Sequence, residues 1–239
     1  MTERDYGFTY AGEPVFSHVR RDIPEPPEPV LDDEFYVFVM GPYTAFDAEY
    51  AYPDGDELQS AFMDDPLFDQ SKHVTADGRG SFQMALEDFC ESLRKELGVH
   101  AFLATDVDIP TDTEADDGEE SMSVLDQSIA FAAVSDAVMF IFSDAGLTTG
   151  VGSEIGAILG EFHLRKGNDE PIRKPRERFR VFDTESFSSA SIDEVPFTYG
   201  IDAVGFETKA DLVDKTQDFL TNLERDDPDR VLRIFNPYS

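Results

Sequence analysis

The feature that most constrains the fold is the stretch 135–160, SDAVMFIFSDAGLTTGVGSEIGAILG, where an apolar run leads through a glycine-rich turn into a helical pattern. Residues 137–142 are continuously apolar, which is typical of a strand buried on both faces. The glycines after this strand allow a tight turn and a close approach of the backbone to a ligand. They are Gly146, Gly150 and Gly152. Because ligands of open parallel sheets bind at the carboxyl ends of the strands, Glu154 in the following helix is a candidate nucleophile or base.

A structural interpretation of the same residues needs no chemistry. Acidic residues are common in the first turn of a helix, because they complement the helix dipole there. The glycines would then serve only the close packing of the helix on the strand. On this short motif alone, the structural interpretation is favoured over the catalytic one.

The rest of the chain alternates between apolar strand patterns and helical patterns. Strands are predicted at residues 35–40, 100–105, 137–142, 179–182, 203–206 and 231–235. Helices are predicted at residues 58–68, 81–97, 122–134, 152–164 and 209–225. This alternation predicts an α/β fold, a single doubly wound domain with a mostly parallel sheet of about five strands and helices on both faces. Residues 35–40 and 137–142 are the most apolar runs, so we expect them to be central and adjacent.

The N-terminal segment differs in composition from the rest of the chain. Residues 1–34 are acidic and proline-rich and are predicted to form a loosely structured arm in front of a domain that spans 35–239. Four aromatic residues of the arm could dock on that domain. They are Tyr6, Phe8, Tyr10 and Phe16.

The charge of the chain is strongly negative. It has 51 acidic and 19 basic residues, a formal net charge of −32, and 41% hydrophobic residues. An acid-rich, lysine-poor surface over an ordinary core is typical of halophilic proteins, because at molar salt the Debye length shrinks to about 3 Å and self-repulsion is screened. We expect folding to weaken when salt is diluted. The absence of a net basic face argues against nucleic acid as a partner.

Two segments stand out by their local charge. The acidic run 106–120 is predicted to be a solvated loop. Between residues 165 and 180 lie seven cationic residues, and the favoured interpretation is a solvated loop that pairs with the acidic surface, the alternative being contact with a phosphate or an acidic partner. These cations are Arg165, Lys166, Arg173, Lys174, Arg176, Arg178 and Arg180.

Cysteine and histidine provide no metal-binding pattern. Cys90 is the one cysteine and falls in a helical apolar pattern, and the four histidines have no close ligand spacing, so no metal and no cofactor are expected. No apolar run is long enough to span a bilayer, and the first residues lack a signal-peptide core. We therefore expect a cytoplasmic protein with no membrane partner.

Two motifs together resemble the nucleoside 2-deoxyribosyltransferase superfamily, which includes the deoxynucleoside-monophosphate N-glycosidases. They are FYVFVMGPYT at residues 35–44 and the strand–turn–helix segment with G-V-G-S-E-I-G at 150–156. The resemblance covers residues 35–165 and implies a compact doubly wound fold. It assigns to Glu154 the role of nucleophile on the anomeric carbon of deoxyribose. It also implies a sugar or phosphate pocket lined by Gly150, Val151 and Gly152 and faced by Gly41, Pro42 and Tyr43.

The chain departs from the pattern of that superfamily at two positions. The superfamily usually has an Asp eight residues before the Asp that opens the strand, and here Ser128 takes this place, with Asp126 as the nearest carboxylate. Transferases of the superfamily often have an Asp six residues before the Glu. In this chain Thr148 takes that position, which resembles the nucleotide hydrolase branch. Protonation of a leaving base requires a second acid, for which Asp126 and Asp144 are the candidates. Asp144 has an equally ordinary interpretation as a turn or cap residue, and Tyr43 has one as a residue that packs against the loop 44–55.

Two functional hypotheses follow. The first is an N-glycosidase or deoxyribosyl-transfer enzyme that acts through Glu154 on a small-molecule nucleoside or nucleotide, with a homo-oligomer expected. The second is a non-catalytic nucleotide-binding or protein-interaction module on the same fold, which Ser128 in place of Asp favours.

Overall fold

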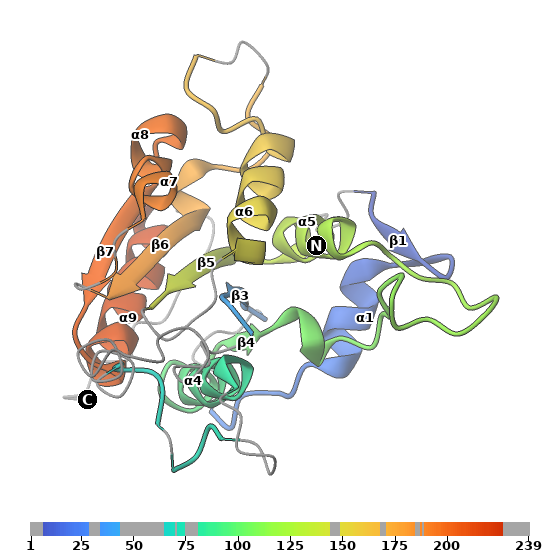
Figure 1. The fold of residues 1–239 in the computed structure, drawn as a ribbon, viewed down its shortest axis with the longest axis horizontal. Coiled ribbons are helices and arrows are strands. Elements are labelled where there is room, and N and C mark those ends of the chain that lie inside the picture. Colours follow the sequence, from blue (N-terminus) through green and yellow to red (C-terminus); the bar gives the residue numbers. More distant parts are fainter. Residues whose placement is uncertain are drawn as a thin grey trace, which may run out of the picture.

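A five-stranded parallel sheet with the strand order β4-β3-β5-β6-β7 forms the centre of the protein (Figure 1). The strands are β3 (Tyr36–Met40), β4 (His100–Phe102), β5 (Ala137–Phe142), β6 (Phe179–Thr184) and β7 (Asp202–Phe206). The computed structural model describes residues 7–28, 34–43, 65–69, 71–74, 81–143, 149–167, 171–184, 187 and 189–226.

Helices cover both faces of the sheet, as the alternation of patterns predicts. Residues of α1, α5 and α6 pack with Phe38 and Phe140 on one face, and residues of α4 and α9 pack with Val39 and Met139 on the other. The long helices are α1 (Val15–Asp22), α4 (Phe82–Glu96), α5 (Val124–Val134), α6 (Thr149–Glu161) and α9 (Lys209–Asp226). Two short helices, α7 (Ala190–Asp193) and α8 (Val195–Tyr199), lie before β7. Within the described ranges, no helix is long and apolar enough to cross a membrane. The chain is a single α/β doubly wound domain.

The prediction that the two most apolar runs are central and adjacent is confirmed. Strand β5 is the middle strand, and β3 pairs with it in parallel, with Val37 opposite Ala137. Every residue of both strands is buried, which explains why neither shows the alternation of a half-exposed strand.

Other predicted boundaries differ from the structure. Strand β4 ends at Phe102, and residues 104–106 turn into a short 3-10 helix instead of continuing the strand. Of the helix predicted at 58–68, residues 65–68 are described and are not helical, while 58–64 lie outside the described residues. The terminal strand predicted at 231–235 also lies outside them.

Residues 1–34 were expected to form a loosely structured arm, but within the described part, residues 7–28, the chain forms a hairpin and a helix. A two-stranded hairpin, β1 (Thr9–Tyr10) with β2 (Glu13–Pro14), leads into α1. Val15 and Val19 of α1 are fully buried in the core. The partly buried Phe8, Tyr10 and Phe16 pack against the same core, whereas Tyr6 lies outside the described residues. The apolar face of α1 lies within an acidic, proline-rich stretch of sequence. Composition alone therefore did not indicate that this segment packs against the core.

Only part of the basic segment 165–180 is the solvated loop that the sequence predicted. The side chain of Lys174 is buried and donates hydrogen bonds to the carbonyls of Ala132, Ala133 and Ser135, at the end of α5. Arg176 donates to the carbonyls of Tyr199 and Leu164 in a similar way. Lys174 and Arg176 therefore complete the hydrogen bonds of buried backbone. Arg173 and Arg180 instead pair with Glu161 and Asp202, as the expected pairing with acidic residues predicts.

Candidate functional site

Glu154 lies on α6, which follows the carboxyl end of the central strand β5. The helix begins at Thr149, three residues before the predicted start at 152, so Glu154 falls in its second turn. The field of the helix dipole is strongest in the first turn, and the stabilisation of an anion that the sequence suggested is therefore weaker here. The side chain of Glu154 is half-buried.

Ser128 on α5 is the hydrogen-bond partner of Glu154. Its hydroxyl donates to Oε2 of Glu154 across 3.3 Å, and the serine itself is buried. Burial raises the pKa of Glu154 above its ordinary value, and the hydrogen bond from Ser128 opposes this rise. The position where the resembling superfamily has an Asp thus contacts the candidate nucleophile.

Tyr43, just after β3, also lies near the candidate nucleophile. Its carbonyl accepts a hydrogen bond of 2.8 Å from the backbone N–H of Gln83, which joins it to the start of α4. Burial, and next the negative charge of Glu154, raise the pKa of the Tyr43 phenol. The phenol therefore stays protonated and can act as a hydrogen-bond donor near Glu154.

A cavity of about 790 Å³ brings these three side chains together. Tyr43, Ser128 and Glu154 all line it, and part of its wall is the chain that follows β4, between Ala104 and Glu114. This volume is within the range of small-molecule sites. Its lining is mixed, with apolar side chains beside the carboxylates Asp106, Asp108 and Glu114.

The wall of the cavity after β4 is the part of the site that sequence analysis missed, because it was predicted to be a solvated loop. Val107 and Ile109 are buried, and the carbonyl of Ile109 accepts a hydrogen bond of 2.7 Å from the side chain of Gln127 on α5. The backbone N–H of Asp108 donates to Asp22 at the end of α1 across 3.0 Å. The alternation of apolar and acidic residues in V-D-I-P at 107–110 was the available signal.

Several residues expected at the site lie elsewhere. Asp126 does not line the cavity: it is exposed, and its carboxylate accepts a hydrogen bond of 2.8 Å from Ser123, which caps α5. Gly41 and Pro42 are buried but are not among the lining residues, and a Cβ at Gly41 would lie 3.0 Å from Leu86. Gly41 therefore serves the close packing of β3 on α4.

The glycine-rich turn itself is described only in part. Asp144 and Thr148 lie outside the described residues. Gly150 and Val151 fall in the first turn of α6, and nothing is described beyond their backbone. Gly152 is exposed, does not line the cavity, and has no atom within 4 Å of an added Cβ.

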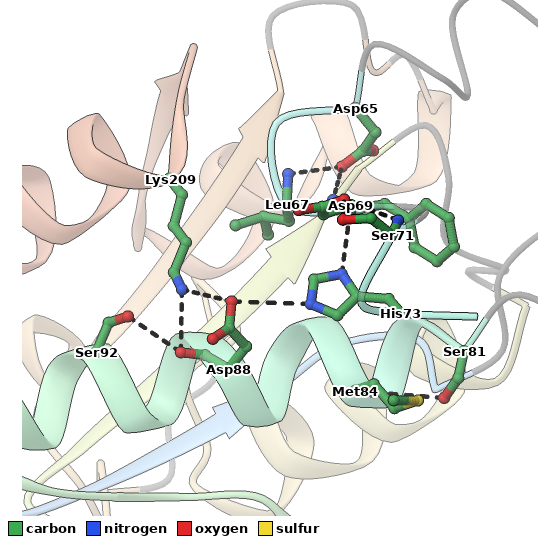
Figure 2. A network of polar contacts seen from close by, with 11 residues as sticks. Asp65, Leu67, Asp69, Ser71, His73, Ser81, Met84, Asp88, Ser92 and Lys209 are labelled. Carbon is green, nitrogen blue, oxygen red and sulfur yellow. Dashed lines mark hydrogen bonds and ion pairs between the residues drawn. The ribbon is translucent and has the colours of Figure 1, made fainter. Parts of the chain in front are cut away.

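A second polar cluster joins the segment before α4 to α4 and α9 (Figure 2). The ammonium of Lys209 lies 2.7 Å from the carboxylate of Asp88, and Nε2 of His73 lies 3.7 Å from the same carboxylate. Nδ1 of His73 accepts a hydrogen bond of 2.9 Å from the backbone N–H of Asp69. A neutral ring with its proton on Nε2 fits these contacts. The cluster thereby anchors residues 65–69 and 71–74 to the face of the sheet that α4 and α9 cover.

Acidification is expected to destabilise the protein through His73. Burial lowers the pKa of His73, although Asp88 and Asp69 oppose this effect, while Lys72 and Lys209 reinforce it. The unfolded chain therefore binds the proton more readily, so the free energy of unfolding is highest above about pH 6.5 and falls as the pH drops below it. Chemical denaturation of wild type and His73→Gln between about pH 7.5 and pH 5 measures this. The variant should show the shallower dependence, and equal slopes would contradict the expectation.

Comparisons with known proteins identify a family whose function is unknown. Residues 20–235 match the family model described as Domain of unknown function (DUF7509). Neither the curated proteins nor the solved structures contain a match to the chain. Among the described residues, no group of three or more His, Cys, Asp or Glu side chains could hold a metal ion.

Proposed function

We propose that this chain, which belongs to the DUF7509 family, is an N-glycosidase or deoxyribosyl-transfer enzyme that acts on a deoxynucleoside or its monophosphate. The observation that carries the proposal is the half-buried carboxylate of Glu154, which lines a cavity at the carboxyl edge of the sheet together with Ser128 and Tyr43. A position of this kind is where ligands of open α/β sheets bind.

In the proposed reaction, Glu154 attacks the anomeric carbon of the bound sugar. The bond from this carbon to the base breaks, and its electron pair leaves with the base, which takes up a proton. Water, or a second base, then attacks the glycosyl ester and releases Glu154. Asp106 and Asp108 line the same cavity, whereas Asp126 does not. Among the described residues they are therefore the candidate donors of the proton that the leaving base takes up.

The environment of Glu154 suits a nucleophile. Burial destabilises its negative charge, as the raised pKa indicates, and formation of an ester removes that charge. The hydrogen bond from Ser128 holds the carboxylate in one orientation and keeps a larger fraction of it ionised. Tyr43 supplies a protonated hydroxyl for the sugar.

The proposal is tested by incubating the full chain with 2′-deoxynucleosides and their 5′-monophosphates in molar KCl. Release of free base is followed by chromatography, and an acid-quenched sample is digested and analysed by mass spectrometry. We expect free base, and a peptide that contains Glu154 with the added mass of a deoxyribosyl group. Binding without release of base would support the non-catalytic module instead.

Ser128→Ala is expected to move the acid limb of the pH–rate profile to higher pH. The variant removes the hydrogen bond that lowers the pKa of Glu154 and leaves the effect of burial unopposed. Because the ionised carboxylate is the reactive form, activity is lost as the pH falls through the pKa of Glu154. The profile of kcat/KM against pH measures this shift. An acid limb that stays in place or moves to lower pH would contradict it.

A further inference from the structure

The cavity beside Glu154 is lined by negative side chains. Asp106, Asp108, Glu114 and Glu154 line it, and its described lining contains no Lys, Arg or His. Glu114 is held as an anion by hydrogen bonds from the N–H and the hydroxyl of Thr111, at 3.0 and 2.7 Å, which lower its pKa. The described lining therefore offers no cationic donor to a phosphate, and all of its charged groups are carboxylates.

Two of the chain segments that continue from lining elements carry no cation in their sequence, whereas the segment before Gln83 carries Arg79. Residues 44–64, which follow Tyr43, and residues 144–148, which follow β5, contain no Lys, Arg or His. Three cations of the basic segment are engaged elsewhere: Lys174 and Arg178 donate to backbone carbonyls around the start of β5, and Arg173 pairs with Glu161.

From this charge distribution we infer that the Glu154 cavity accepts an uncharged nucleoside and rejects the corresponding 5′-monophosphate, an inference that rests on the proposed function and chooses between its two substrates. A phosphate monoester carries close to two negative charges at neutral pH, and placing it among carboxylates is unfavourable. Sugar hydroxyls and the amino group of a base are hydrogen-bond donors, which carboxylates and the carbonyls of the wall can accept.

The inference is tested by calorimetric titration of the full chain with 2′-deoxyadenosine and with its 5′-monophosphate in about 1 M KCl, where exposed charges are strongly but not completely screened. The nucleoside is expected to bind at least about tenfold more tightly. The double variant Asp108→Asn/Glu114→Gln removes two charges from the cavity wall and should reduce this ratio. Asp116→Asn/Glu119→Gln removes two charges from the same loop outside the cavity and should leave the ratio unchanged.

Each result of these titrations supports or overturns the inferred selectivity. A monophosphate that binds as tightly as the nucleoside, or a chain that binds neither, overturns the inference. The inference is also overturned if both double variants change the ratio of nucleoside affinity to monophosphate affinity equally. The effect would then come from the net charge of the protein and not from the cavity. If the nucleoside binds with the expected preference and no base is released, the proposed function fails while the selectivity of the cavity stands.

Discussion

Glu154→Gln is expected to lower the rate of base release by about 10³-fold or more, because an amide lacks the nucleophilic anion that forms the glycosyl ester. Glutamine keeps the size of the side chain and can still accept the hydrogen bond from Ser128. The buried charge is removed, so the variant should be at least as stable as the wild type, and a loss of activity would not reflect unfolding. Initial rates in molar KCl and thermal melting of the same samples measure both effects.

The matched control for this variant is Glu161→Gln on the same helix. Glu161 pairs with Arg173 at the far end of α6 and does not line the cavity. We expect its rate to stay within about twofold of the wild type, since an exposed ion pair contributes little to stability. A Glu154→Gln enzyme that keeps more than a tenth of the wild-type rate would rule out Glu154 as the nucleophile.

The second large effect is expected from Lys174→Met, which should reduce the free energy of unfolding by about 3–5 kcal/mol. Lys174 is 2% exposed, and its ammonium donates hydrogen bonds to three carbonyls at the end of α5. Methionine fills a similar volume but leaves these carbonyls without their charged donor, and it removes a cation from the negative end of the helix dipole.

Denaturant titration in molar salt measures this loss. Lys95→Met is the control: Lys95 is exposed and forms an ion pair one helical turn away with Glu91 on α4, so its loss should change the free energy of unfolding by less than about 1 kcal/mol. A similar small change for Lys174→Met would mean that water replaces its hydrogen bonds, and that the basic segment is not a structural support of α5.

Local patterns in the sequence were sufficient to predict the central elements. The apolar run at 137–142 and the helical patterns of α4, α5, α6 and α9 appear in the structure with small changes at their ends. These elements are predictable because a strand buried on both faces appears as a continuous apolar run, and a buried helix face appears as apolar residues spaced by about one helical turn. In α1 the helical pattern is short and lies within an acidic, proline-rich segment, and its burial against α5 was not foreseen.

The position of Glu154 after the central strand was thus determined by the sequence alone, together with the α/β order of the chain. The tertiary structure decided which groups surround it. Ser128 and Glu154 are 26 residues apart and meet because α5 and α6 pack side by side. The carboxylates of the wall are placed by contacts with Gln127 and Asp22, and Lys174 reaches α5 from a distant segment. Such contacts leave no period in the sequence, because they depend on where whole elements pack and not on the pattern within any one of them.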